Sequence, residues 1–327
     1  MRLLLKGIPN PRQAEFFRSQ ARHTAYGGAR GGGKSWAMRR KLVLLALHAP
    51  GLNLLLLRRT LPELRENHLV PLLAELGGVA VYNGTERVFR FPTGSRLRLG
   101  YCDKEADVYQ YQGQEYDVIG LEEATHFTEE QMQFLTTCNR TVKPDFKPRM
   151  YYTCNPGGPG HGWVKERFIT VAPPMTRVVE EMELPGPDGK KRKMQRDRMF
   201  VPATVYDNQE LLKNAPGYLA SLSMLPEAEK KALLLGDWDS FTGQVFTEWR
   251  NDPAHYEDQR WTHVVKPFRI PDWWRVYRGF DWGYAKPFSV GWYAVDGEGR
   301  MYRIRELYGI SADGTPNAGA KMQVAEV

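Results

Sequence analysis

The sequence of 327 residues contains only three cysteines, and they exclude two classes of scaffold. They are an odd number, lie far apart and form no C-x-x-C pair: Cys102, Cys138 and Cys154. Neither a disulfide framework nor a zinc site has this spacing. We therefore expect buried or surface thiols in a reducing cytosol.

Long apolar runs are also missing. The two best candidates, Leu42–Leu47 and Leu52–Leu57, fall short of the ~20 residues that a membrane span needs. Met1–Asn10 has no small-residue cleavage site, so it is not a secretory signal. The sequence also lacks internal repeats, low-complexity tracts and serine–histidine or cysteine–histidine pairs. We expect no membrane partner and no hydrolase of the serine or cysteine class.

Basic residues moderately outnumber acidic ones. Lys and Arg number 45 against 38 Asp and Glu, which gives a net charge of +7. This excess is compatible with a polyanionic partner, but many basic proteins bind no nucleic acid. The basic run Lys190–Arg198 is open to two interpretations, a surface that tracks the DNA backbone or a solvated hairpin.

Strand-like and helix-like segments alternate through the first half of the chain. A helix is expected over Lys34–Ala49, stopped by Pro50-Gly51. Apolar strands are expected to end near Tyr26 and to cover three further segments: Leu52–Arg59, Tyr116–Leu121 and Met150–Thr153. This alternation predicts an α/β fold with a mostly parallel sheet between layers of helices.

Shorter signals mark the remaining segments. Arg87–Phe91 and Ser95–Tyr101 flank a Pro-Thr-Gly turn and predict a hairpin, and a helix is expected from Thr128. From Pro173 the chain becomes rich in proline and glycine, which predicts a loop or hairpin excursion, followed by helix over Leu211–Gly236.

The last part of the chain reads as three strands: Trp274–Phe280, Phe288–Val295 and Met301–Tyr308. Asp296-Gly297-Glu298-Gly299 predicts the hairpin turn between the last two. A Trp- and Pro-rich connection precedes them, so we expect a domain boundary within 245–272.

One segment matches a phosphate-binding loop without a mismatch. It comprises Gly28, Ala29, Arg30, Gly31, Gly32, Gly33, Lys34 and Ser35. Glycines let backbone N–H groups wrap a phosphate closely, and the following helix presents its positive end to it. We predict an ATP site in which Lys34 reaches the β- and γ-phosphates and Ser35 ligates Mg²⁺.

Two glutamates follow the strand that ends at Leu121. Glu122 is predicted to hold Mg²⁺ through water, and Glu123 to orient and deprotonate the attacking water. An Asp is commoner than a Glu at the first of these two positions, so Glu122 departs from the usual pattern of such ATPases. Taken alone, two glutamates after a strand are also typical of a helix N-terminus. The phosphate loop upstream favours the catalytic interpretation.

Three polar or small residues end another strand: Thr153, Cys154 and Asn155. Side chains at this edge of a sheet can sense the γ-phosphate, and the alternative is a simple turn. Arg30 lies inside the phosphate loop, where it can stabilise γ-phosphate charge in cis.

Three further residues have two interpretations each. Arg58 and Arg59, at the end of the Leu52–Arg59 strand, are either site residues or solvated surface arginines. Gln13 is either an adenine contact or an ordinary helix residue.

In their order along the chain, these motifs resemble the large terminase subunit of tailed bacteriophages, a DNA-packaging motor. The resemblance rests on the phosphate loop, on Tyr111–Asp117 running into Glu122–Phe127, and on three later segments: Thr153–Pro156, Leu235–Asp239 and Gly279–Gly283. It covers nearly the whole chain, and the order of the motifs is more specific than any one of them.

The resemblance implies a P-loop NTPase fold of the RecA/ASCE type, a lid and an RNase H-like nuclease. It implies that Gln13 contacts adenine, that Arg30 is the cis-acting arginine and that Thr153–Asn155 couple hydrolysis to movement. The implied partners are double-stranded DNA, the portal ring, the small terminase subunit and other copies of the chain. Such a protein is phage or prophage encoded and acts in the host cytoplasm.

By the same resemblance, residues 1–175 form the ATPase core, 176–245 a lid, 246–272 a connection and 273–327 the first part of the nuclease. Asp281 matches the family's first nuclease metal ligand. The family's other ligands lie further along than Val327, so we expect a truncated chain that does not cut DNA. Asp296 is better explained as a turn residue, and Glu306 is the other nearby carboxylate.

Two alternatives remain at this point. One is another DNA-dependent P-loop ATPase, helicase-like or recombinational. The other is an ATP-binding module that is inactive by itself.

Overall fold

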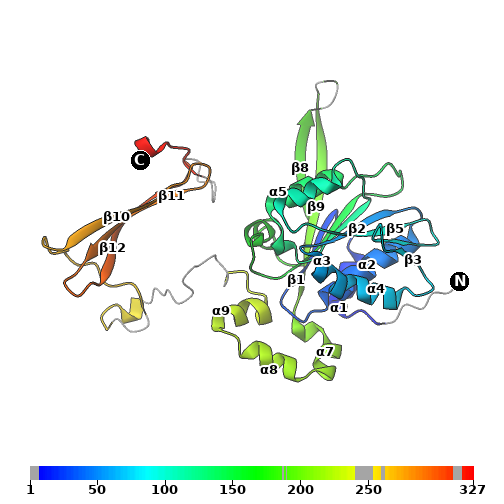
Figure 1. Ribbon diagram of the computed structural model, residues 1–327, viewed down its shortest axis with the longest axis horizontal. Helices are drawn as coiled ribbons and strands as arrows, with labels where there is room; N and C mark the ends of the chain where they lie inside the picture. Colours follow the sequence, from blue (N-terminus) through cyan, green and yellow to red (C-terminus); the bar gives the residue numbers. More distant parts are fainter. Residues whose placement is uncertain (1–6, 186–187, 189, 240–252, 259–261, 312–318) are drawn as a thin grey trace. The chain divides into compact units, whose positions relative to one another are not determined.

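The computed structural model describes residues 7–185, 188, 190–239, 253–258, 262–311 and 319–327. The chain divides into two compact units, Met1–Thr247 and Glu248–Val327 (Figure 1). The expected boundary at 245–272 falls partly outside the described residues. None of the described helices is both long and apolar enough to cross a bilayer.

The described part of the first unit is built around a nine-stranded sheet in the order β3-β4-β5-β2-β6-β7-β1-β9-β8. Its parallel strands are β1 His23–Gly28, β2 Asn53–Arg58, β5 Arg96–Tyr101, β6 Val118–Leu121, β7 Arg149–Cys154 and β9 Lys191–Ala203. Three antiparallel strands lie at the two sides: β3 Val81–Asn83, β4 Val88–Arg90 and β8 Val178–Pro185.

Helices cover both faces of the sheet. On one face pack α1 Pro11–Arg18, α2 Lys34–His48, α3 Leu61–Leu64 and α4 Val70–Glu75, the last two joined by a π-helical turn, η1 Arg65–Leu69. The other face is covered by η2 Glu105–Tyr111, α5 Glu129–Cys138, α6 His161–Val164 and η4 Lys165–Ile169. The predicted α/β fold with a mostly parallel, helix-flanked sheet is therefore confirmed.

The strongest local patterns fold as the sequence indicated. Leu54–Leu57 is completely buried between β5 and β6, as expected for an apolar run with helices on both sides. The helix α2 begins directly after Gly33 and ends before Pro50-Gly51. The predicted hairpin forms from β4 and β5.

The segment after Pro173 differs from the prediction of a simple excursion. A hairpin does form from β8 and β9, but β9 is 13 residues long and its second half enters the main sheet beside β1. Phe200, Val201 and Ala203 are buried there, which is why the strand continues inward. The sheet therefore includes strands from the range 176–245 that the sequence assigned to a lid.

The helical segment that follows is interrupted. It consists of α7 Gln209–Asn214, α8 Gly217–Ser223, α9 Glu227–Lys230 and η6 Lys231–Leu235. Pro216 and Pro226 stand at the two breaks, because proline cannot donate the helical hydrogen bond. Gly236 ends the segment with φ 72°, in agreement with the predicted end.

The second unit contains a three-stranded antiparallel sheet among its described residues: β10 Arg275–Asp281, β11 Phe288–Val295 and β12 Met301–Gly309. Asp296 accepts hydrogen bonds from the N–H groups of Glu298 and Arg300 in the turn between β11 and β12, as predicted. Apolar side chains on this sheet remain exposed, including Phe280, at 43%, and Leu307, at 44%.

Candidate functional site

The predicted phosphate loop lies at the carboxyl edge of the sheet, between the end of β1 and the start of α2. Gly33 is the N-cap of α2 and has φ 71°, a left-handed conformation that L side chains rarely adopt. A Cβ on this glycine would also lie 2.5 Å from the side chain of Gln13. The loop therefore requires glycine here for its conformation, and an added Cβ would also displace the Gln13 amide.

Three side chains hold successive carbonyl groups of the loop. Asn208 donates to the carbonyl of Gly31 at 2.7 Å, Tyr26 to that of Gly32 at 2.9 Å, and Gln13 to that of Gly33 at 3.1 Å. Within the described chain, no backbone carbonyl accepts a hydrogen bond from the N–H groups of residues 31–35. These N–H groups are the donors that a phosphate would use.

The start of the loop is anchored to two later segments. Ala29 N–H donates to Ala203 at the end of β9, at 2.9 Å, and Arg30 N–H to Leu233 of η6, at 2.7 Å. A Cβ on Gly236 would lie 2.9 Å from the backbone of Gly28. The helical segment after β9 thus packs directly on the phosphate loop.

Lys34 joins the loop to the end of β7. Its Nζ donates to the carbonyl of Ala29 at 2.5 Å and to Oδ1 of Asn155 at 2.7 Å. The side chain is buried, and this burial lowers the pKa of Lys34, while Glu123 and Glu122 act in the opposite direction.

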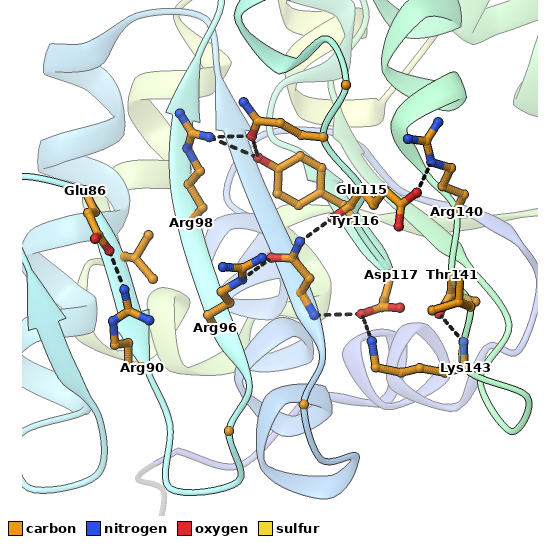
Figure 2. A pocket seen from close by; sticks show the side chains of 17 residues that line it. Glu86, Arg90, Arg96, Arg98, Glu115, Tyr116, Asp117, Arg140, Thr141 and Lys143 are labelled. Atoms are coloured by element: carbon orange, nitrogen blue, oxygen red, sulfur yellow. Dashed lines mark hydrogen bonds and ion pairs between the residues drawn. The ribbon is translucent and has the colours of Figure 1, made fainter.

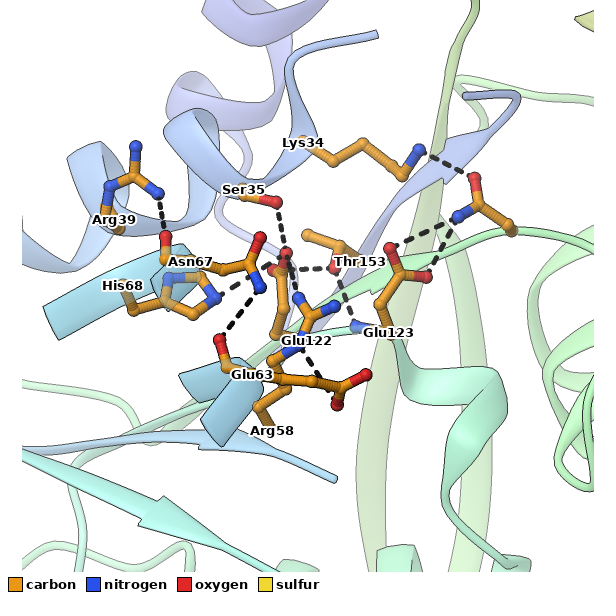
Figure 3. A network of polar contacts seen from close by, with 11 residues as sticks. Lys34, Ser35, Arg39, Arg58, Glu63, Asn67, His68, Glu122, Glu123 and Thr153 are labelled. Atoms are coloured by element: carbon orange, nitrogen blue, oxygen red, sulfur yellow. Dashed lines mark hydrogen bonds and ion pairs between the residues drawn. The ribbon is translucent and has the colours of Figure 1, made fainter. Parts of the chain in front are cut away.

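Glu122 is completely buried beside Ser35 and Thr153 (Figure 3). Ser35 Oγ donates to one carboxylate oxygen at 2.5 Å, and Thr153 Oγ1 donates to the other at 2.8 Å. Arg58 lies 3.5 Å from the first oxygen. A buried carboxylate needs such partners, since an isolated one would be strongly disfavoured.

His68 also approaches Glu122, with Nε2 3.7 Å from the carboxylate. Burial, and then the charges of Arg39 and Arg58, hold the pKa of His68 well below its usual value. His68 is therefore neutral, and Arg58 supplies the positive charge next to Glu122. Arg58 lies beside Glu122 and is not solvated, whereas Arg59 contacts Gln131 of α5.

Glu123 has φ 54° and ψ 59°, a left-handed conformation that is uncommon for a residue with a side chain. Its N–H donates to Thr153 Oγ1 at 3.0 Å. Both of its carboxylate oxygens accept from Nδ2 of Asn155 (Figure 3). Strained backbone of this kind is concentrated at functional sites.

Two of the remaining predicted residues lie at the same loop. Arg30 is exposed and lines the cavity in front of Lys34. Gln13 lies in the first turn of α1, where its side chain forms a capping box with Asn10 in addition to its contact with Gly33. Cys154 is buried in the apolar cluster that includes Trp163 and Val164 of α6.

Asp281 belongs to the second unit, at the end of β10. It pairs with Ser289 in the sheet, and Ser289 Oγ lies 3.4 Å from a carboxylate oxygen of Glu306. Asp281 and Glu306 therefore share one face of this sheet.

A cavity of about 510 Å³ opens in front of the phosphate loop. Its lining includes Arg30, Lys34, Ser35, Arg58, Glu123, His126, Asn155, Asn208 and Tyr218. A second cavity, of about 780 Å³, shares residues with the first and extends past Gln13 and Trp36 to Asp207. Together they offer room for a triphosphate at the loop and a base beside α1.

A larger cavity, of about 980 Å³, lies at the opposite edge of the sheet, where β2, β5 and β6 begin. Figure 2 shows that its acidic residues are paired with cations: Glu86 with Arg90, Glu115 with Arg140 and Asp117 with Lys143. It contains none of the predicted site residues, so size alone does not identify the nucleotide site.

The oxygen atoms near the loop suit Mg²⁺ better than a metal held by protein alone. No group of three or more His, Cys, Asp or Glu side chains in the described residues could hold a metal ion. Mg²⁺ typically takes one or two protein oxygens and completes its shell with phosphates and water. The Ser35 hydroxyl and the Glu122 carboxylate, in direct contact, fit that requirement.

Sequence reasoning did not predict that Tyr26, Asn208 and Gly236 contact the phosphate loop. Asn208 carries the signal of a helix N-cap, because its side chain accepts from Leu211 N–H at the start of α7. Its contact with Gly31 spans 177 positions and has no local signal. His68 and its position beside Glu122 were also unpredicted.

Residues 20–216 match a family model described as phage terminase large subunit, which covers more than half of the chain. The chain belongs to the phage terminase large-subunit family. The resemblance inferred from the motifs is therefore confirmed. No curated protein matches the sequence.

Solved terminase structures share the fold. The large terminase of a thermophilic bacteriophage in complex with ADP is 17% identical, with a TM-score of 0.53 over 91% of this chain and 68% of that chain. The large terminase ATPase domain of Thermus phage P74-26 is 15% identical, with a TM-score of 0.51 over 72% of this chain and 95% of that chain. At this identity the likeness supports a P-loop NTPase fold and nothing finer.

Proposed function

We propose that this chain is the ATP-hydrolysing subunit of a motor that moves viral double-stranded DNA into a procapsid. The observation that carries the proposal is the arrangement of Glu123, Asn155 and Lys34 beside the phosphate loop. It joins a carboxylate, a positioning amide and a phosphate-binding cation in one hydrogen-bonded row. Family membership supports the same function.

ATP would bind with its β- and γ-phosphates against the N–H groups of residues 31–35 and Lys34. Lys34 would leave its present oxygen partners for phosphate oxygens, which are stronger acceptors. Arg30, exposed at the cavity, would stabilise charge on the γ-phosphate oxygens in the transition state. Gln13 and the adjoining cavity would receive the adenine.

Glu123 would accept a proton from the attacking water. The water oxygen then bonds to the γ-phosphorus as the bond to the bridging oxygen breaks, giving ADP and phosphate. Asn155 fixes the carboxylate through both oxygens, and Thr153 fixes the backbone of Glu123. We assign Thr153, Cys154 and Asn155 to coupling because the strand that carries them touches both glutamates.

Ser35 and Glu122 would hold Mg²⁺ together with the phosphates. The ion would neutralise part of the negative charge on the β- and γ-phosphates. Arg58 would place its positive charge beside the buried Glu122 carboxylate.

The wider assignments follow the family. The proposed partners are double-stranded DNA, a portal ring, a small terminase subunit and further copies of this chain, in the host cytoplasm. We propose an ATPase core over 1–175, to which β8 and β9 add strands. The lid would cover 176–245, the connection 246–272 and the first part of an RNase H-like domain 273–327.

ATP turnover of the full chain, measured with and without double-stranded DNA, tests the proposal. We expect DNA-stimulated hydrolysis that Glu123→Gln abolishes while ATP binding is retained. Glu130→Gln, at an exposed position in α5, is the matched control and should leave turnover unchanged. ATP binding with no turnover in the presence of DNA would instead indicate a binding module, and separation of DNA strands would indicate a helicase.

A further inference from the structure

The hairpin of β8 and β9 is a two-stranded ribbon that extends beyond the other strands of the first unit (Figure 1). Glu180–Pro185 and Lys191–Gln195 are all exposed. An isolated two-stranded ribbon is marginally stable, and an exposed edge strand readily pairs with another molecule. The ribbon is therefore a candidate binding surface, and the chemistry of its side chains indicates what kind of molecule it binds.

The register of the ribbon separates its charges onto two faces. Successive side chains alternate between the faces, and directly opposed residues share one. One face carries three arginines, to which we refer as the arginine face: Arg192, Arg196 and Arg198, with Glu180 and the opposed pair Met182 and Met194. The other face carries both lysines of the ribbon: Lys191 and Lys193, with Glu181, Glu183 and Asp197.

The lysine face is electrically balanced. Lys191 lies 3.1 Å from Glu183, and Lys193 lies 3.5 Å from Glu181. At its base, Arg177 and Asp197 form an ion pair at 2.5 Å. Three cations thus face three carboxylates, and little positive charge is left for a partner.

The arginine face carries an excess of positive charge. Its strand positions hold three arginines against the single carboxylate of Glu180, which pairs with Arg198. Arg192 has a 64% exposed side chain, and its contact with Asp188 of the turn is long, at 3.8 Å.

Further positively charged side chains lie on the body of the first unit. His23, opposite Arg198 in the sheet, is buried, and its Nε2 has no hydrogen-bond partner among the described residues. Burial, followed by the charges of four guanidinium groups, holds the pKa of His23 well below its usual value: Arg167, Arg22, Arg196 and Arg198. Arginines from three segments therefore lie around the start of β1 and the middle of β9.

We propose that the arginine face binds the phosphodiester backbone of double-stranded DNA. This rests on the proposed function, to which it adds the surface that contacts the substrate. A guanidinium group matches a phosphate with paired donors, which suits arginine better than lysine. The flexible, half-exposed Met182 and Met194 lie between the arginines and can adapt to a sugar–phosphate surface.

The sequence left two interpretations for the run Lys190–Arg198, a DNA-binding surface or a solvated hairpin. The structure assigns that role to alternate residues only. Arg192 and Arg196 are expected to contact DNA, whereas Lys191 and Lys193, their neighbours in sequence, are expected to contribute nothing.

A salt titration of the full chain tests this assignment. The affinity for a fluorescein-labelled 30-bp DNA duplex of random sequence is measured by anisotropy between ~50 and ~200 mM NaCl. Arg192→Gln with Arg196→Gln should reduce the slope of log affinity against log salt by about two, because each phosphate that is no longer neutralised lowers it by ~0.9. Lys191→Gln with Lys193→Gln removes the same charge from the same hairpin and should leave the slope within about half a unit of the wild type.

Two further measurements keep the outcomes distinct. Arg192→Lys with Arg196→Lys should retain most of the slope, and all variants should keep the basal ATP turnover, since neither pair lies at the nucleotide site. An equal loss in the arginine and lysine variants, or none in either, would overturn the proposal while leaving the motor function intact.

If the wild type binds no DNA at any salt concentration, the proposed function fails together with this inference. If the arginine variant keeps its DNA slope but sediments as a smaller species than the wild type, the arginine face joins copies of the chain. That result would also overturn the proposal.

Discussion

Asn155 donates from a single Nδ2 atom to both carboxylate oxygens of Glu123, at 3.2 and 3.0 Å. The amide therefore fixes the plane of the carboxylate as well as its position. Because Asn155 Oδ1 accepts from Lys34, the orientation of the amide is determined by the phosphate-binding lysine. The proposed base and the phosphate site are linked through one side chain.

Replacement of Asn155 should affect the rate rather than nucleotide binding. We expect Asn155→Ala to lower kcat by about 10²-fold, since a small misplacement of a catalytic group has an effect of this size. The KM for ATP should change much less, because Lys34 and the loop N–H groups remain. Steady-state kinetics check the split. A fall in ATP affinity as large as the fall in kcat would show that Asn155 binds nucleotide instead.

Asn208 offers a test of how the loop is held. Asn208→Asp keeps the oxygen that caps α7 but removes the donor to the Gly31 carbonyl. The Gly31 carbonyl would lose its donor and face a carboxylate instead, so we expect a disturbed loop and roughly tenfold weaker ATP binding by calorimetry. Asn214→Ala, at an exposed position of the same helix, is the control. Equal affinity in Asn208→Asp and the wild type would contradict this role.

Lys41 in α2 should make the stability of the first unit depend on pH. Burial, followed by the charge of Arg149, lowers the pKa of Lys41 to about 7 from its usual 10.5. Unfolding therefore takes up a proton between about pH 7 and 10.5, and this term makes the folded state more stable as the pH rises through that window. Its slope is at most about 1.4 kcal/mol per pH unit.

The contribution of Lys41 can be isolated by difference. Urea unfolding of the wild type and of Lys41→Met is compared from about pH 7 to 9.5, below the titration of most other lysines. The free energy of unfolding should rise more steeply with pH in the wild type. Lys213→Met, at an exposed site, should behave like the wild type. Parallel curves for the wild type and Lys41→Met would show that Lys41 titrates normally.

The second unit should not cut DNA in this chain. Two-metal cleavage needs about three carboxylates around two ions, and the described strands bring Asp281 and Glu306 to one face. We expect supercoiled plasmid to stay intact in Mg²⁺ or Mn²⁺, as followed on agarose gels. Robust linearisation that Asp281→Ala abolishes would refute this expectation.

The sequence predicted those parts of the site that depend on local pattern. The glycine loop, the buried leucines of β2 and the two glutamates after β6 all carry their signals within a few residues. Two of the partners that fix them, Asn208 and Ala203, could not be predicted, because they lie far from the loop in sequence and reach it only in the folded chain. The left-handed backbone of Glu123 likewise follows from its surroundings rather than from its residue type.

The separation of charges on the hairpin could not be predicted from the sequence either. Lys190–Arg198 is a predominantly basic run in sequence, and only the pairing of β8 with β9 divides it into a balanced face and an arginine face. The proline- and glycine-rich start of this region predicted a loop or hairpin excursion, and the hairpin forms. The burial of Phe200 and Val201 in addition draws the second half of β9 into the sheet.

Because β9 is one uninterrupted strand from Lys191 to Ala203, its outer and inner halves share a single side-chain parity. Insertion of one residue in its middle would turn the arginines to the opposite side of the ribbon or expel Phe200 from the core. Natural changes in the length of this strand should therefore occur in steps of two, or be confined to the tip of the hairpin. An alignment of related sequences with hairpins of different length would show this pattern.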